Sequence, residues 1–464
     1  MSFFSQDNPQ CHDFLNGAKK ALDDDRLQAQ LARSLKDGFQ KKRLKGMSRL
    51  PEYEDLRDRA KAIKAHTLEN LDTYLEQFEA QVIAAGGQVH WARDDAEACK
   101  IIIDICQSVN AKTVTKGKSM IAEEIGLNAQ LVANGIEPVE TDLGEYIIQL
   151  RKEPPSHIIA PAFHISKEQV ADTFHEHHLK QVQGRDLTEP TTLVHEAREE
   201  LRQKFLNADV GITGANVLVA ETGTGLIVTN EGNGDLTQSL PPVHIAVSSI
   251  EKVVPTLDDA DTILRLLART ATGQEMSVYT TFFTGAKRDT DLDGPSQFHM
   301  VLLDNRRSEL LGGPLHDVLS CMRCGACINH CPIYAKVSGH AYGWVYPGPI
   351  GSILTPHFVG VDEAHLLPNA CTMCGRCEEV CPVRIPLPKL LRTWRGRAFE
   401  AGHPGGVQRL GLKFWAWFAK RPALYHTVVR PAVGVLRCMG KARPFDLPAP
   451  QGGTFMDRYK KGER

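Results

Sequence analysis

CMRCGACINHCP, residues 321–332, and its near copy CTMCGRCEEVCP, residues 371–382, together hold eight of the 12 cysteines in this chain of 464 residues. Each segment reads C-x2-C-x2-C-x3-C-P, and the two-residue gaps allow three thiolates to surround one cluster of metal ions. The start of the chain, MSFFSQDNPQ, does not read as a secretory signal. We therefore expect a cytoplasmic chain whose reduced cysteines bind metal rather than form disulfides.

The fourth cysteine of each segment stands directly before a proline, a pattern typical of ferredoxins with two [4Fe–4S] clusters, where this residue ligates the other cluster. The sequence thus predicts two [4Fe–4S] clusters with crossed ligation. The predicted ligands of cluster 1 are Cys321, Cys324, Cys327 and Cys381. The predicted ligands of cluster 2 are Cys371, Cys374, Cys377 and Cys331. Zinc is the alternative, but zinc sites of four thiolates usually use two separated C-x2–4-C pairs.

Two further residue types recur in these segments. Gly325 and Gly375 follow the second cysteine, where a tight wrap of the chain leaves little room for a side chain. Arg323 and Arg376 would place positive charge beside the clusters, which raises a reduction potential. The alternative interpretation is that both arginines are simply solvated.

Hydrophobic spacing divides the chain into four predicted parts. Apolar residues recur every three or four positions up to Gly86-Gly87, which predicts an N-terminal helical segment over 1–87. Strand and helix patterns then alternate, HIIAPAFH at 157–164 among the predicted strands, which indicates an α/β domain over 88–305 with a partly parallel sheet. From residue 210 the strands crowd together and predict an antiparallel part. An α-helical ferredoxin-like domain with two clusters is expected over 306–392.

The remaining part, 393–464, is predicted to be a basic tail with helical and extended pieces. The chain has a net charge of −2, yet residues 389–464 hold 16 Lys or Arg against four acidic residues, a local net charge of +12. Such a tail favours an acidic partner or peripheral contact with an anionic membrane, and a solvated basic surface is the alternative. No run of about 18 apolar residues predicts a transmembrane segment, and we expect no nucleic-acid partner.

Polar residues gather at predicted strand ends, where α/β folds build binding sites. GANVLVAETGTGLIVTNEGN at 214–233 supplies Glu221, Thr222, Asn230, Glu231 and Asn233. TKGKSMIAEEIG at 115–126 adds Lys116, Lys118, Ser119 and Glu124 as an anion pocket at a helix start. Glu221 and Lys118 are the catalytic candidates, and turn formation with helix capping is the alternative reading. Neither segment completes a P-loop or a dinucleotide fingerprint, so no NAD or flavin site is predicted.

With KSMIAEEIGLN at 118–128, GITGANVLVAETGT at 211–224 and HAYGWVYPGPIG at 340–351, the chain resembles the lactate utilization protein B family nearly end to end. The resemblance implies an α/β domain similar to the ribose-phosphate isomerase and CoA-transferase-like fold, joined to a helical ferredoxin module. It also implies a bacterial cytosolic complex with two partner subunits that oxidises L-lactate to pyruvate. In that fold Glu221 falls at a vestigial nucleophile position. Members of this family often carry three cysteines in the second motif, and here Cys371 supplies a fourth, which favours two complete clusters.

The resulting hypothesis is an iron–sulfur electron-transfer subunit, not itself catalytic, of an NAD-independent L-lactate oxidation system that passes electrons to a quinone or another acceptor. One alternative is that the α/β domain is an enzyme acting on a carboxylate or acyl substrate. The other is a regulatory or assembly protein whose clusters are structural.

Overall fold

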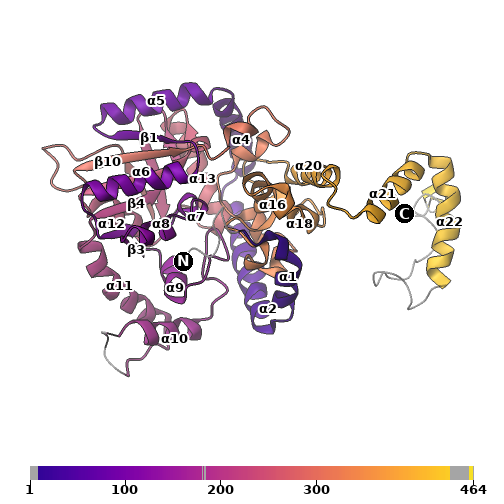
Figure 1. The fold of residues 1–464 in the computed structure, drawn as a ribbon, viewed down its shortest axis with the longest axis horizontal. Helices are drawn as coiled ribbons and strands as arrows, with labels where there is room; N and C mark the ends of the chain where they lie inside the picture. The colour runs from indigo at the N-terminus through magenta and orange to yellow at the C-terminus, as the bar shows by residue number, and fades with distance from the viewer. Residues whose placement is uncertain (1–8, 180, 182–183, 439–458, 463–464) are drawn as a thin grey trace. The chain divides into compact units, whose positions relative to one another are not determined.

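The computed structural model describes residues 9–179, 181, 184–438 and 459–462 (Figure 1). The chain divides into two compact units, Met1–Gly396 and Arg397–Arg464. The first unit therefore contains the first three predicted parts: the helical segment over 1–87, the α/β domain over 88–305 and the ferredoxin-like domain over 306–392. One continuous core joins them, since it contains Leu75 of the N-terminal helices, Met300 of the sheet and Leu319 beside the first cysteine motif.

The N-terminal segment is helical, as its amphipathic pattern predicts. Its helices are α1 (Phe14–Leu22), α2 (Asp25–Leu31), a π-helical stretch (Ala32–Gln40), α3 (Lys41–Ser48), α4 (Tyr53–Glu69) and α5 (Leu71–Ala84). The break between α3 and α4 falls at Leu50-Pro51, and α5 ends at Gly86, whose φ of 82° takes the chain out of the helix.

A six-stranded parallel sheet forms the centre of the first unit, in the order β1-β10-β7-β4-β2-β3. Its strands are β1 (Gln88–Ala92), β2 (Thr113–Lys116), β3 (Glu137–Glu140), β4 (Val210–Gly214), β7 (Val243–Ser249) and β10 (Gln297–Leu303). The chain places β3 on one side of β2 and then returns to place β4 on the other side. The strand order thus reverses between β2 and β4, and the carboxyl ends of open parallel sheets hold ligands at such a point.

Helices cover both faces of this sheet, which explains why its strands are apolar on both sides. Val301 packs with the core under α6, whereas Met300 and Leu302 face the core that contains α5. The helices of the α/β part are α6 (Asp95–Ser108), α7 (Met120–Glu124), α8 (Leu127–Ala133), α9 (Leu143–Arg151), α10 (Lys167–His177), α11 (Pro190–Leu206), α12 (Asn233–Ser239) and α13 (Leu257–Thr272).

A second sheet of four strands, in the order β8-β5-β6-β9, contains the antiparallel part expected after residue 210. Its strands are β5 (Val217–Val219), β6 (Thr224–Thr229), β8 (Val253–Val254) and β9 (Tyr279–Phe283). The strand predicted over 157–164 is wrong. That segment is a turn, because Ser156 bonds to the carbonyl of Pro161 through both its backbone N–H (3.1 Å) and its hydroxyl (3.0 Å).

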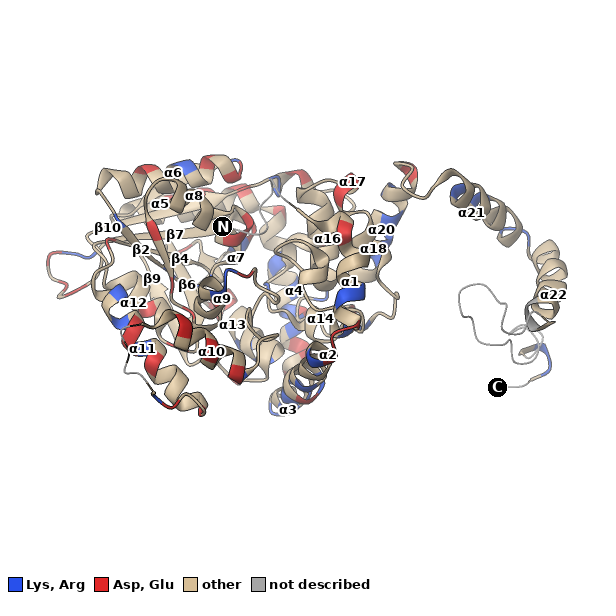
Figure 2. Ribbon diagram, turned by 60° about the horizontal axis from the view of Figure 1, so that its bottom comes forward, with Lys and Arg blue, Asp and Glu red and all other residues tan. Residues whose placement is uncertain are grey.

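Short helices carry the two cysteine motifs. They are α14 (Ala326–Asn329), α15 (Tyr334–Val337), α16 (Gly348–Phe358), α17 (Val361–Ala364), α18 (Leu366–Asn369), α19 (Arg376–Glu379) and α20 (Leu387–Glu400). Figure 2 shows acidic and basic residues interspersed over the helices of the first unit. The second unit contains α21 (Gly406–Ala419) and α22 (Pro422–Cys438), and residues 439–458 and 463–464 of the predicted tail lie outside the described residues. Among the described residues, none of the helices combines the length and apolar character needed to cross a bilayer.

Candidate functional site

The two cysteine motifs fold alike. The second residue after the first cysteine, Arg323 or Met373, has a positive φ of 58° or 57°. The glycine after the second cysteine follows with 72° at Gly325 and 79° at Gly375. A one-turn helix comes next in each motif, α14 or α19. The glycines are therefore favoured by the left-handed backbone, and a Cβ atom at Gly375 would meet no other atom of the chain within 4 Å.

The cysteines fall into two electrostatically interacting groups, each drawn from both motifs. The first group is Cys321, Cys324, Cys327 and Cys381. The second group is Cys331, Cys371, Cys374 and Cys377. Cys327 also interacts with Cys377, so the two groups adjoin. Each group thus unites three cysteines of one motif with the last cysteine of the other.

The local chemistry of these cysteines fits a [4Fe–4S] cluster in each group. Backbone N–H groups donate to the sulfurs of Cys321 (3.4 Å), Cys371 (3.3 Å) and Cys381 (3.3 Å), and such bonds tune iron–sulfur potentials. Burial raises the pKa of Cys324 to about 12 and that of Cys331 to about 11. Since metals bind thiolates, binding of a cluster at these cysteines would release the protons.

The two groups differ in their access to solvent. In the first motif Cys324 is buried and Cys327 is partly buried, whereas in the second motif Cys374 is exposed. The second motif therefore provides the side of the cysteine region that another protein can approach.

Arg323 joins the first motif to the α/β part through a buried ion-pair network. Its guanidinium lies 3.4 Å from Glu251, which also pairs with Arg307 at 3.0 Å. Although burial alone would raise the pKa of Glu251, Arg307 and Arg323 lower it to about 2. The solvated interpretation of Arg323 is wrong, because its side chain is 9% exposed and stacks over Tyr346. Arg376 is half exposed and pairs with the neighbouring Glu379.

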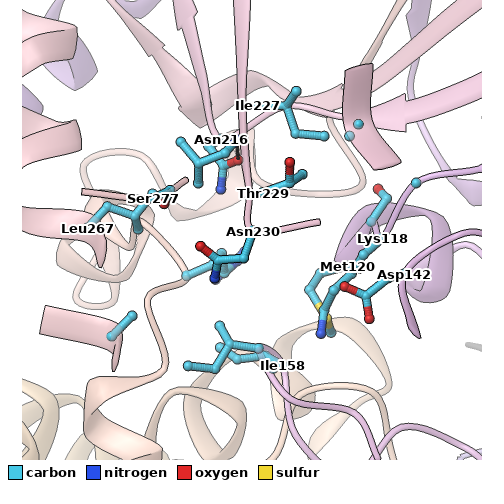
Figure 3. Close-up of a pocket in the computed structure, with 18 of the residues that line it drawn as sticks. Lys118, Met120, Asp142, Ile158, Asn216, Ile227, Thr229, Asn230, Leu267 and Ser277 are labelled. Atoms are coloured by element: carbon cyan, nitrogen blue, oxygen red, sulfur yellow. Dashed lines mark hydrogen bonds between the residues drawn. The ribbon is translucent and has the colours of Figure 1, made fainter. Parts of the chain in front are cut away.

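A pocket of about 440 Å³ lies between the α/β part and the first motif. It opens where the strand order reverses: Lys118 and Ser119 follow β2, and Ala215 and Asn216 follow β4. Figure 3 shows Lys118 and Asp142 on one flank, Leu267 and Ser277 on the other, and Asn230 between them. The turn at 158–163 also lines this pocket, as do Arg323 and Cys324 of the first motif.

Three of the residues that line the pocket carry a positive charge. They are Lys118, Lys252 and Arg323. Burial and the nearby Arg323 lower the pKa of Lys252 to about 8, which indicates a cation that is short of counter-charge. Asp142 and Glu231 provide a second, acidic element, in which burial and then Asp142 raise the pKa of Glu231.

The structure separates the predicted site residues into two sets. Those that line the pocket are Lys118, Ser119, Asn230, Glu231 and Asn233. Lys116 instead pairs with Glu123 (2.9 Å) and Glu140 (2.8 Å), and Glu124 accepts from Arg307. Glu221 is exposed outside the pocket lining, where its carboxylate caps the backbone N–H of Leu257 at the start of α13 (2.7 Å).

The sequence does not predict that three charged residues line the pocket. They are Asp142, Lys252 and Arg323. Asp142 carries a signal, because it precedes a helical pattern as a cap, and it accepts from the backbone N–H groups of Gly144 and Glu145 at the start of α9. Lys252 and Arg323 come from distant segments, and no local pattern connects them.

Comparison with known proteins bears on both parts of this site. Residues 75–303 match the LUD domain family, and residues 317–385 match the 4Fe-4S dicluster domain family. A "Lactate utilization protein B" of Lysinibacillus sphaericus is 41% identical over 467 residues, which cover 96% of each chain. The chain belongs to the lactate utilization protein B family. It combines a mixed α/β domain built on a parallel sheet with a helix-rich 4Fe-4S dicluster domain.

Two further matches carry other names. An "Uncharacterized electron transport protein YkgF" of Escherichia coli is 41% identical and covers 90% of each chain. The crystal structure of a DUF162 family protein from Deinococcus radiodurans matches at 15% identity with a TM-score of 0.28, covering 50% of this chain and 98% of that chain. This last similarity is too low to support a statement about the fold.

Proposed function

We propose that this member of the lactate utilization protein B family is the iron–sulfur electron-transfer subunit of a cytoplasmic, multi-subunit, NAD-independent system that oxidises L-lactate to pyruvate. The bound clusters would supply one-electron transfer. The chain would hold them through Cys321, Cys324, Cys327 and Cys381, and through Cys371, Cys374, Cys377 and Cys331. Two further subunits and a downstream acceptor, a quinone or another carrier, complete the proposed system.

The observation that carries this proposal is the crossed grouping of the cysteines, which unites the two motifs into adjoining sites. The exposed Cys374 supports an exchange of electrons with a partner protein on the side of the second motif. The names of the relatives, which mention lactate utilization and electron transport, support the substrate and the role.

The finer fold and domain assignments belong to the same proposal. We infer an α/β domain over 88–305 related to the ribose-phosphate isomerase and CoA-transferase-like fold, between a helical segment over 1–87 and a ferredoxin-like domain over 306–392. The basic tail over 393–464 would contact partners or the membrane surface. Acyl transfer at Glu221 has no support from the structure, since this carboxylate caps α13.

The deciding experiment is anaerobic iron and sulfide analysis of the purified chain with EPR, before and after lactate is added with the co-purified partners. We expect about eight irons per chain, as two cubane clusters require, and reduced-cluster signals only when lactate and partners are both present. The Cys324→Ser variant should abolish lactate turnover by the complex. Clusters that lactate never reduces would refute the proposed role.

A further inference from the structure

The pocket between β2, β4 and the first cysteine motif contains only one of the eight motif cysteines, Cys324, in its lining, and it has the properties of a ligand site. Its volume of about 440 Å³ is within the range of small-molecule pockets, about 300–1,000 Å³. It also lies at the carboxyl ends of strands where their order reverses, the usual ligand position in open α/β sheets.

Several buried polar atoms of this pocket lack a hydrogen-bond partner among the described residues. They are Nζ of Lys118, Oγ1 of Thr229, Oδ1 of Asn233, and Nε and Nη1 of Arg323. Asn233 is 4% exposed and the Arg323 side chain 9%, so solvent reaches neither freely. Leaving such atoms unpaired inside the protein is unfavourable. Their concentration in one pocket indicates that a ligand supplies the missing partners.

The charges of the pocket select the ligand. Lys118 lies 3.8 Å from Glu145, too far for a hydrogen bond, and this leaves its ammonium group able to bind a second carboxylate. Arg323 pairs with Glu251, a carboxylate that it shares with Arg307. Lys252 brings a third cation to the same lining. These three cations outnumber the two acidic residues of the lining, Asp142 and Glu231, so the pocket favours an anion.

Other parts of the lining are apolar. Met120, Ile158, Phe163 and Leu267 contribute to it. A bare inorganic anion would leave this surface in contact with water, whereas an organic anion would cover it with its carbon atoms.

We infer that this pocket binds an organic carboxylate, with the carboxylate group against Lys118, Lys252 and Arg323 and the carbon body against the apolar lining. The α/β part of the chain is then a ligand-binding domain, and its ligand lies beside Cys324 of the first motif. This inference adds a ligand class to the proposed electron-transfer role and does not depend on that role.

Calorimetric titration of the full-length chain, purified anaerobically and without partner subunits, tests the inference. The probes are pyruvate, L-lactate and 4-methyl-2-oxopentanoate, with neutral ethyl pyruvate and inorganic phosphate for comparison. We expect the carboxylates to bind at least about tenfold more tightly than the ester, the difference expected for a charge-assisted contact. We also expect 4-methyl-2-oxopentanoate to bind more tightly than pyruvate, because its larger body covers more apolar surface.

Three variants and one control locate the site. Lys118→Met and Lys252→Met should each weaken carboxylate binding about tenfold or more. Lys112→Met is the matched control, because Lys112 is exposed at the other end of β2, and it should bind as the wild type does. Ala215→Leu, which changes no charge, should weaken binding by filling the pocket, and it decides the question if a lysine variant fails to fold.

Several results would overturn the inference. These are no binding of any carboxylate, equal binding of the ester, tighter binding of phosphate than of every carboxylate, or unchanged binding in Ala215→Leu. The assay involves no electron transfer, so a chain that binds carboxylates but whose clusters lactate never reduces would refute only the proposed function. Clusters that are reduced by lactate in a chain that binds no carboxylate would refute only the pocket assignment.

Discussion

Arg323, in the first cysteine motif, and Glu251, directly after β7, form a buried ion pair 3.4 Å long that joins the cysteine region to the α/β part of the molecule. Arg307 completes the network by pairing with Glu251 (3.0 Å) and with Glu124 (2.8 Å). The side chains of Arg307, Glu124 and Glu251 are at most 2% exposed, so the charges depend on one another for compensation.

Replacing Glu251 should destabilise the protein strongly. In Glu251→Gln, Arg323 loses its carboxylate and Arg307 keeps only Glu124, and breaking such a buried pair costs about 3–5 kcal/mol. Denaturant unfolding under anaerobic conditions measures this change as a lower midpoint. Glu379→Gln is the control, because Glu379 pairs with Arg376 at the surface and should change the unfolding free energy by less than about 1 kcal/mol. Equal midpoints for Glu251→Gln and the wild type would show that the network adds no stability.

Crossed ligation can be tested by pairing serine variants across the motifs. Cys324→Ser and Cys381→Ser should lose the same EPR signal, because both residues belong to the first cysteine group. Cys331→Ser should lose the other signal, since Cys331 interacts with Cys371 and Cys374. Iron analysis should give about four irons for each variant, the content of one remaining cubane. If Cys331→Ser and Cys324→Ser lose the same signal, each motif binds its own cluster without crossing.

The left-handed glycine of the second motif provides a third prediction. Gly375 has a φ of 79° and open space around it, so Gly375→Ala should cost about 1–2 kcal/mol through backbone conformation alone. Gly375→Asn should be milder, because Asn tolerates this conformation better. Gly396→Ala is the control: its surroundings are equally open, but it lies within α20 and should not destabilise. Thermal unfolding compares the three variants, and an unchanged midpoint for Gly375→Ala would contradict this explanation.

The sequence predicts features that depend on local spacing and fails on those that depend on distant segments. The cysteine motifs, the helices before Gly86 and most strands are local patterns. The burial of Arg323 depends on Glu251, 72 residues away, and no pattern around residue 323 indicates it. Arg376 of the second motif also stands next to a cluster cysteine in the sequence, yet it pairs at the surface, so an adjacent cysteine does not indicate whether an arginine is buried.

The pocket shows the same limit. Lys118 and Asn233 are found because polar residues at strand ends predict a site. Glu221 satisfies the same rule but lies at the surface, where its carboxylate accepts from the backbone N–H of Leu257. The turn at 157–164 has an apolar composition like that of a strand, and its role becomes visible only where His157 contacts Asn329 of the first motif (2.9 Å).

Buried histidines should make the protein sensitive to mild acid. Burial, followed by the charge of His299, lowers the pKa of His244 to about 3, and His244 shares a hydrogen bond with the hydroxyl of Thr213 (2.8 Å). In the unfolded chain a histidine has a pKa of about 6.5. Between these values the unfolded state binds a proton that the folded state cannot, so stability falls as the pH is lowered from about 6.5 towards 3. Each such histidine contributes up to about 1.4 kcal/mol per pH unit.

Replacing His244 should therefore flatten the dependence of stability on pH. In His244→Gln the glutamine keeps a hydrogen-bonding group near Thr213 but does not titrate, so the slope of unfolding free energy against pH below about 6.5 should decrease by about 1.4 kcal/mol per pH unit. Urea unfolding at several pH values between about 5 and 7.5 measures both slopes. His175→Gln is the control, because His175 is exposed on α10. A variant whose slope equals that of the wild type would show that His244 takes up its proton in the folded protein, against the burial that lowers its pKa.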